Sequence, residues 1–215
     1  MKKSISLAAL IAVSSLFIIG CSKDDTEAPI ITITGSNPLQ LEMLQTYTEL
    51  FATADDNEDG NITSSINIDA SEIENRLPAT YNVYYSVSDA AGNPADAIRE
   101  VVVYATNNAL ATTYSVVDCC FTTSGTFVDD YLYNQVLTAT GSSTNTWTEF
   151  AGVPVSPSFS TTITGNGAIT MGSQNINSTT LASGSGNVIL NGFQLNYTLV
   201  NTAGSTSNCR AYYTR

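Results

Sequence analysis

Two stretches of regular alternation between core-type and polar residues constrain the fold of this chain more than any other feature. Residues 81–88 (YNVYYSVS) carry tyrosine or valine at every second position, and residues 193–200 (FQLNYTLV) repeat the pattern with phenylalanine, leucine and tyrosine. A period of two places these side chains on one face of an extended strand, whereas a helix needs a period near 3.6. Both halves of the chain are therefore expected to consist of β-strands.

The N-terminal half has further strand and turn signals. Ile30–Thr34 is β-branched throughout, and the turn Ala90–Asn93 separates the strand at 81–88 from a valine-rich strand at Ile98–Tyr104. The strands at 81–88 and Ile98–Tyr104 are expected to form a hairpin. Short strands at this spacing, broken by Asn, Asp, Gly and Pro, predict a sandwich of roughly seven strands.

This half also carries several family motifs in order. They are Ala28–Gly35, Tyr47-Thr48, Ala52–Thr63 and Tyr81–Asn93. Together they resemble the Cry22Aa-type bacterial Ig-like domain of pesticidal crystal proteins and bacterial surface proteins, which is akin to hyalin-repeat domains. The resemblance covers residues 28–105. It implies an Ig-like β-sandwich that acts as a spacer or adhesion module, with no catalysis.

The C-terminal half, residues 109–215, is expected to be a second β domain. About eight candidate strands lie between Tyr114 and Thr214, and Asn191-Gly192 is a strong signal for a two-residue hairpin. Such strands would form an antiparallel barrel or a two-sheet sandwich. Their order resembles lipocalin-like domains that follow Ig modules in surface lipoproteins. Most acidic residues precede Thr106–Asn108, which is therefore the expected joint.

The N-terminus has the features of a secretory signal peptide, residues 1–20. Lys2 and Lys3 precede an apolar run from Ile5 to Ile19, and Gly20 follows. A basic start, a short apolar core and a small residue before the cleavage site are typical of such a signal. The run is too short to cross a hydrocarbon core, which needs roughly 20 residues.

The residues after the apolar run suggest an anchor. Ile18–Cys21 resembles the lipobox of bacterial lipoproteins, which implies lipidation of Cys21. Ser22–Asp25 resembles the acidic export tag of lipoproteins displayed on the outside of some Gram-negative cells, and residues 21–27 would form an acidic linker. We therefore expect a protein that is lipid-anchored in the outer membrane and faces the cell exterior, although an ordinary solvated linker has a similar composition.

Three cysteines remain for disulfide formation after Cys21. In a strand, Cys119 and Cys120 point to opposite faces, so only one of them meets Cys209 across a sheet. An exported chain permits such a bond. We expect a bridge from Cys209 to one of the pair, with a vicinal Cys119–Cys120 bond as the alternative. Zinc is not expected, because the chain has no histidine and thiolate sites usually use four ligands.

The net charge excludes two classes of partner. The chain has 19 acidic and 7 basic residues, a formal charge of −12. Removal of Lys2 and Lys3 with the signal peptide makes the mature chain more negative still. Such a surface repels nucleic acid and anionic lipid, so the only expected membrane contact is the lipid anchor.

An acidic loop is a candidate calcium site. Asp55, Asn57 and Asp59 follow the spacing of a calcium loop, with Asp89 as an additional oxygen ligand. The usual glutamate at loop position 12 is replaced by Ile66. The alternative interpretation is a solvated turn between two strands.

We do not expect catalysis. Without histidine, Ser-His-Asp and Cys-His mechanisms are excluded. A pair of carboxylates for glycoside hydrolysis would have to come from Asp118, Asp129, Asp130 and Glu149. Asp129 and Asp130 are adjacent and are expected in a turn before a strand at Tyr133–Ala139.

Aromatic residues suggest recognition of a ligand. Trp147 is the only tryptophan, and Tyr131, Tyr133 and Phe150 lie near it in sequence. Exposed, they would stack on sugar rings; buried, they would fill the core of a small β domain. The function expected from these features is non-catalytic recognition of a glycan or another extracellular ligand. The alternative is a structural or adhesive accessory subunit that contacts envelope proteins.

The lipobox yields a direct prediction. Mass spectrometry of the mature protein should show acylation of Cys21, because two or more acyl chains are needed for stable attachment. The Cys21→Ser variant should leave the membrane fraction. An unmodified Cys21 in the wild-type protein would contradict the anchor.

Overall fold

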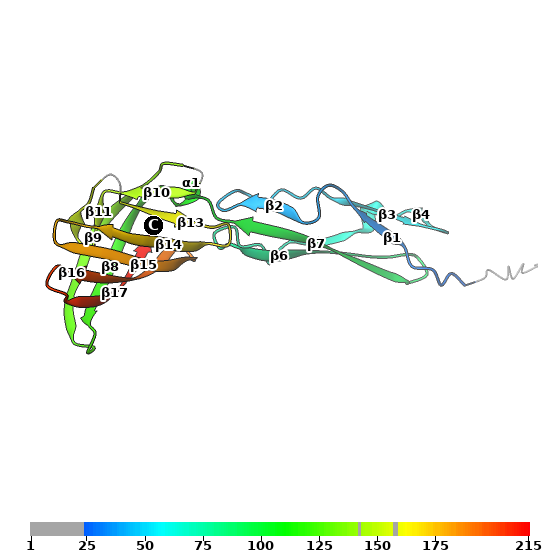
Figure 1. The fold of residues 1–215 in the computed structure, drawn as a ribbon. Helices are drawn as coiled ribbons and strands as arrows, with labels where there is room; N and C mark the ends of the chain where they lie inside the picture. The colour runs from blue at the N-terminus through cyan, green and yellow to red at the C-terminus, as the bar shows by residue number, and fades with distance from the viewer. Residues whose placement is uncertain (1–23, 142, 157–158) are drawn as a thin grey trace, which may run out of the picture.

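The computed structural model describes residues 24–141, 143–156 and 159–215. Two β-rich parts lie end to end in an elongated molecule, and the N-terminal segment is at the end opposite the second part (Figure 1). The expected signal peptide and the lipidation site, residues 1–21, lie outside the described residues. No helix of the described residues is long and apolar enough to cross a membrane.

The first part, which we call the arm, contains two packed sheets. One sheet has the order β1-β3-β4, and the other has the order β2-β7-β6-β5. The strands are β1 (Ile30–Ile33), β2 (Leu39–Glu42), β3 (Ala52–Asp56), β4 (Gly60–Asn61), β5 (Asn67–Asp69), β6 (Ala79–Ser88) and β7 (Pro94–Tyr104). A short 3-10 turn, η1 (Thr63–Ser65), links β4 to β5.

The predicted hairpin is β6 and β7. Val83, Tyr85 and Val87 are buried, which confirms the alternation. β7 begins at Pro94, earlier than the expected Ile98, because Pro94 pairs with Ser88 as the first residue of the strand, where a missing N–H is tolerated.

A buried arginine ties the loops of the arm to this hairpin. Arg99 on β7 is fully buried, and its Nη1 and Nη2 donate to the carbonyl oxygens of Ser36 and Thr34, both at 2.7 Å. Its Nε donates to the Tyr85 hydroxyl at 3.0 Å, and Glu49 lies 3.7 Å from Nη2. A buried charge needs this degree of compensation. Arg99 therefore fixes the loops around Ser36 and Glu49 against the strands.

The second part is a closed antiparallel barrel, which decides between the two architectures expected for this half. The strand order around it is β10-β13-β14-β15-β16-β17-β8-β9. The helix α1 (Asn107–Leu110) precedes it. The barrel strands are β8 (Thr113–Thr122), β9 (Phe127–Ala139), β10 (Thr144–Trp147), β13 (Ser160–Ile163), β14 (Ala168–Asn175), β15 (Thr180–Ile189), β16 (Gly192–Asn201) and β17 (Thr206–Thr214). A small hairpin, β11 (Glu149–Phe150) and β12 (Val153–Pro154), lies outside this order.

The hairpin predicted at Asn191-Gly192 exists with a shifted turn. The two residues between β15 and β16 are Leu190 and Asn191, and Asn191 has a φ of 67°. Gly192 is already in β16, where a Cβ would lie 1.8 Å from the carbonyl oxygen of Tyr213. The glycine is needed for this close approach of β16 to β17.

One apolar cluster fills the barrel and extends into the arm. Trp147 is 2 % exposed, and its ring meets the rings of Phe150, Phe159, Phe193 and Tyr213 edge to face. The same cluster includes Met43, Val103 and Ala105 from the arm and the joint. The Ala105 N–H also donates to the carbonyl of Gly165 at 2.8 Å. Packed contacts therefore join the arm to the barrel.

A disulfide links β8 to β17. Cys120 and Cys209 face each other in the register and are bonded, whereas Cys119 is free. This confirms the expected bridge from Cys209. The partner is Cys120 because its side chain points into the barrel, while Cys119 points outward beside Arg210.

A buried carboxyl lies beside this disulfide in the barrel interior. Asp118 is fully buried, and its Oδ2 accepts a hydrogen bond from the Tyr197 hydroxyl. Its Oδ1 has no hydrogen-bond partner among the described residues. Burial raises the pKa of Asp118 from 3.8 to about 6, although the Tyr197 hydrogen bond acts in the opposite direction.

The disulfide should contribute strongly to stability. Its two cysteines are 89 residues apart, and a cross-link over such a loop contributes about 3–5 kcal/mol in the chain-entropy model. The free energy of unfolding of Cys120→Ala/Cys209→Ala, measured by urea denaturation, should fall by that amount. Cys119→Ala is the matched control and should change it little. Equal stability of the two variants would contradict this role.

Asp118 should make stability depend on pH. The raised folded-state pKa means that the folded state binds this proton more tightly than the unfolded state. The stabilisation is full below about pH 4 and is lost as the pH rises to about 6. Asp118→Asn keeps an acceptor for Tyr197 without the charge. We subtract the free energy of unfolding of the wild type from that of the variant at each pH. This difference should increase by about 3 kcal/mol from about pH 4 to pH 7.

The control for this prediction is Asp130→Asn, an exposed change on the neighbouring strand β9. The difference in free energy of unfolding between this variant and the wild type should not change over the same pH range. If this difference were also independent of pH for Asp118→Asn, burial would not destabilise the charged form of the interior carboxyl.

Candidate functional site

An open groove of about 770 Å³ crosses the outer face of the barrel. It is formed by β8, β17, β16 and β15, which are neighbours in the closed sheet. The register aligns its outward side chains in two rows. One row is Cys119, Arg210, Asn196 and Ser185, and the next is Phe121, Asn208, Thr198 and Ser183.

Two glycines let the sheet bend beneath the groove. A Cβ at Gly184 would lie 2.4 Å from the carbonyl oxygen of Asn196, and one at Gly186 would lie 1.9 Å from that of Gln194. Only glycine allows this approach of β15 to β16, and glycine inside a strand is typical of a bend in a barrel. The pairing of β14 with β15 is also irregular between Met171 and Gln174.

The polar side chains of the groove hold one another in place. Arg210 Nε donates to Asn196 Oδ1 at 3.0 Å, and the Thr198 hydroxyl donates to Asn208 Oδ1 at 3.4 Å. The Arg210 Nη1 and Nη2 groups make no hydrogen bond within the described part of the chain. The guanidinium is therefore oriented by one contact and presents its remaining donors to the groove.

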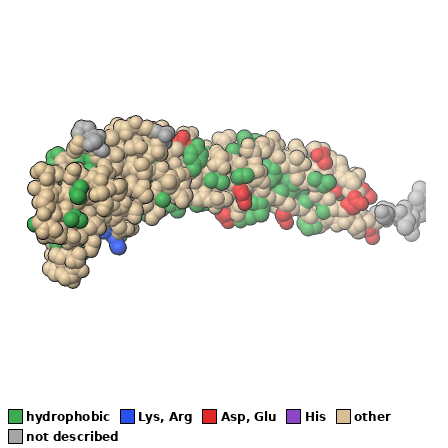
Figure 2. Space-filling model, in the orientation of Figure 1, with side chains coloured by type: hydrophobic (Ala, Val, Ile, Leu, Met, Phe, Trp, Pro, Cys, Tyr) green, Lys and Arg blue, Asp and Glu red, His purple; other side chains and the backbone are tan. Residues whose placement is uncertain are grey.

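Aromatic rings lie at the edges of these polar rows. Phe121 is 40 % exposed and Tyr212 is 39 % exposed, and both line the groove. The Phe121 ring is held by an edge-to-face contact with Phe127 at 5.7 Å. The groove thus combines apolar surface with groups that donate and accept hydrogen bonds, a combination typical of ligand sites. Figure 2 shows that the visible face of the barrel carries few charged side chains.

The aromatic residues singled out in the sequence are not an exposed platform, which corrects the ligand-binding hypothesis for them. Trp147 and Phe150 are buried in the core cluster. Tyr131 and Tyr133 are half-buried and pack against the same cluster, and the Tyr133 hydroxyl accepts from the Ala151 N–H at 3.1 Å. A small barrel uses these large side chains to fill its interior, which is the second of the two interpretations weighed for them.

The four carboxylates considered for catalysis lie in different environments. Asp118 faces the barrel interior, whereas Asp129 and Asp130 are exposed on β9 and not in a turn, because β9 begins at Phe127. Glu149 is half-buried on β11, and its N–H donates to the Gln135 side chain. Only Asp118 is buried among tyrosines.

The residues of the predicted calcium loop are engaged in local hydrogen bonds. Asp55 Oδ1 accepts from the Asn61 side chain at 3.0 Å, and Asp59 Oδ2 accepts from the Ala90 N–H at 2.6 Å. Asn57 is exposed in the turn between β3 and β4. Of the four predicted ligands, only Asp89 belongs to the group of carboxylates that the structure brings together.

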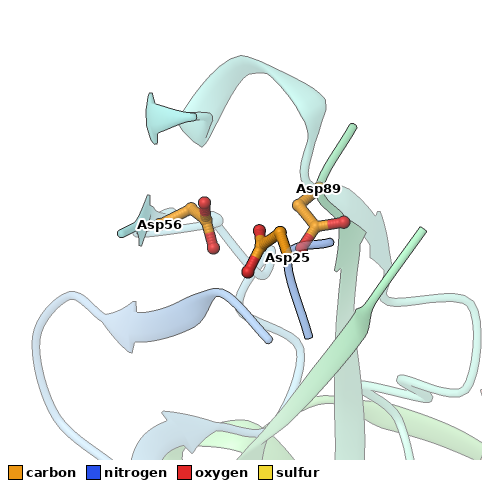
Figure 3. A group of neighbouring side chains, drawn as sticks. All are labelled: Asp25, Asp56 and Asp89. Atoms are coloured by element: carbon orange, nitrogen blue, oxygen red, sulfur yellow. The ribbon is translucent and has the colours of Figure 1, made fainter. Parts of the chain in front are cut away.

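That group, the acidic cluster, consists of Asp25, Asp56 and Asp89. One carboxylate oxygen from each lies within 4.8 Å of the others, as Figure 3 shows. Burial would raise the pKa of Asp89, but hydrogen bonds from Asn93 and from the Gly92 N–H outweigh it and lower the pKa. Sequence reasoning missed Asp25, because it lies in the linker, and Asp56, because it is outside the loop spacing.

Comparison with known proteins finds a family match within the arm. Residues 31–103 match the family described as "Bacterial surface protein, Ig-like domain". This agrees with the two-sheet architecture and with the resemblance seen in the motifs. No curated protein matches the chain.

Solved structures share only a distant likeness. The lipoprotein BT2262 from Bacteroides thetaiotaomicron is 15 % identical with a TM-score of 0.35, covering 85 % of this chain and 98 % of that one. A Clostridium perfringens ZmpB structure, containing CBM51-2 with GlcNAc and INT domains, is 15 % identical with a TM-score of 0.30, covering 86 % of this chain and 44 % of that one. Residues 31–103 of the arm are thus similar to the Ig-like domain of bacterial surface proteins.

Proposed function

We propose that this protein is a lipid-anchored recognition protein whose barrel binds a saccharide in the outer groove. The observation that carries the proposal is the groove itself. Its two registered rows consist mainly of Asn, Ser, Thr and Arg, with the exposed ring of Phe121 at the end of one row and that of Tyr212 beside the other. Its volume of about 770 Å³ is within the range usual for ligand sites, roughly 300–1,000 Å³. The proposed role is non-catalytic.

The chemistry of the rows favours a sugar. Each hydroxyl of a saccharide both donates and accepts, and the side chains of Asn196, Asn208 and Ser185 offer both functions. The exposed rings of Phe121 and Tyr212 offer apolar surface for the C–H face of a sugar ring. Arg210 supplies a charged donor, which makes stronger hydrogen bonds than a neutral one.

The arm fits a role as a spacer. In Figure 1 the described N-terminal residues and the barrel are at opposite ends of the molecule. A chain lipidated at Cys21 in the outer membrane would thus carry the groove away from the membrane, on the outer surface of the cell. We assign the arm to the Cry22Aa type of surface Ig-like domain on the motifs from Ala28 to Asn93.

A second candidate function, an accessory subunit that contacts an envelope protein, is favoured by one observation. The outer face of β9 and β8 exposes apolar side chains beside the groove. Leu132 is 82 % exposed, and it pairs in the register with Val117, which is 51 % exposed. Exposed apolar patches of this kind are typical of protein interfaces.

Glycan binding provides the test. The soluble mature chain with Cys21→Ser should bind a subset of saccharides on a glycan array. Arg210→Ala should weaken that binding about tenfold or more, because a charged hydrogen bond contributes about 1.5–3 kcal/mol. Arg215→Ala is the matched control, since Arg215 is also an exposed barrel arginine but donates to the Ala109 carbonyl outside the groove.

The melting temperatures of both arginine variants should match that of the parent. If the protein bound no saccharide on the array, the groove would not be a sugar site. Capture of an envelope protein that is lost in Leu132→Asp and kept in Arg210→Ala would then establish the accessory role.

A further inference from the structure

The acidic cluster brings together three segments that are distant in sequence. Asp25 belongs to the linker before β1, Asp56 ends β3, and Asp89 follows β6. Figure 3 shows their carboxylates pointing toward one another. Figure 2 shows acidic side chains gathered at this free end of the arm. Carboxylates at this separation repel one another unless a positive charge lies between them.

One oxygen of the cluster has no protein partner. Asp56 Oδ1 accepts the N–H groups of Glu58 and Asp59, both at 2.9 Å. Asp56 Oδ2 exposes less than 1 Å² and makes no hydrogen bond with any described residue. A buried carboxylate oxygen without a partner is unfavourable, and an ion that binds there would supply the missing contact.

Asp89 presents a second oxygen in a fixed position. Its side chain is 8 % exposed, and its Oδ1 accepts the Gly92 N–H at 2.6 Å and the Asn93 N–H at 2.7 Å. The Asn93 side chain donates to Asp89 Oδ2 at 2.7 Å and to the carbonyl oxygen of Asp25 at 3.2 Å. The same asparagine therefore orients one ligand and holds the linker beside it.

We propose that Asp25, Asp56 and Asp89 bind a divalent cation of the size of calcium. Three oxygens that are no more than 4.8 Å apart lie within about 2.8 Å of a common point, so a small side-chain adjustment brings each to about 2.4 Å from an ion, which is the usual calcium distance. Magnesium, at about 2.1 Å, would require a tighter group. Hard carboxylate oxygens suit calcium, and water completes the coordination on the solvent side.

The site would attach the linker to the arm. Asp25 is four residues after Cys21. With the ion bound, the chain from Asp25 onward is held against the end of the arm. Calcium would thereby restrict the directions in which the arm leaves the anchor. This role is independent of what the barrel binds.

Calorimetric titration with calcium at neutral pH tests the site on the mature Cys21→Ser chain. We expect a dissociation constant between about 10⁻⁴ and 10⁻³ M, the range of extracellular modules. Asp25→Asn and Asp56→Asn should each weaken binding about tenfold or more, because each removes one charged ligand. Asp55→Asn is the matched control at the neighbouring exposed aspartate and should change the affinity less than about twofold.

Amide hydrogen exchange of residues 24–29 gives a second readout. Calcium should slow it in the parent and in Asp55→Asn, but not in Asp25→Asn or Asp56→Asn. Three results would overturn the proposal. The first is no heat of binding and unchanged exchange at about 10 mM calcium. The second is calcium binding that survives Asp25→Asn or Asp56→Asn. The third is calcium binding that is lost in Asp55→Asn, which would place the ion in the loop.

Discussion

Closure of the C-terminal sheet by the pairing of β8 with β17 is the constraint on which the rest of the barrel depends. Closure removes the sheet edges and separates one interior from one exterior. The Cys120–Cys209 disulfide lies on the inner side of this seam, and Cys119 and Arg210 lie opposite each other on its outer side. The same seam therefore stabilises the core and brings together strands from the two ends of the domain to form the groove.

The arm and the barrel share apolar packing at their junction. Met43 and Val103 belong to the core cluster that contains Trp147, and Arg76 donates to the side chain of Asn191 at 3.0 Å across the junction. A joint with such contacts is stiffer than a free linker. The direction of the groove relative to the arm is thus set by packing, which suits a protein that must present one face outward.

Much of the fold could be predicted from residue patterns. The alternation at 81–88 and 193–200 identified β6 and β16, and opposite facing of Cys119 and Cys120 limited the bridge to one of them. The groove could not be predicted, because its outward residues come from strands that become neighbours only when the sheet closes. Register across β8, β17, β16 and β15 is non-local, and no sequence spacing encodes it.

The aromatic and acidic residues lie where they do for more local reasons. β10 (Thr144–Trp147) buries Asn145 as well as Trp147, so its polar sequence does not mark the inward face, and both the exposed and the buried interpretation of the tryptophan stayed open. The spacing of the calcium loop pointed to Asp55 and Asp59. In the structure, Asp55 accepts from the Asn61 side chain and Asp59 accepts from the Ala90 N–H. Asp25 joins the cluster because the linker passes beside the turn after β6, where the Asn93 side chain donates to the carbonyl oxygen of Asp25.

The most direct measurement for the central claim is amide chemical-shift mapping of the isotope-labelled mature chain with a saccharide that it binds. The account predicts that the shifted resonances belong to the outer face of β8, β15, β16 and β17, centred on Ser185, Asn196 and Arg210. Shifts confined to the arm, or to the β8–β9 face around Leu132, would contradict it.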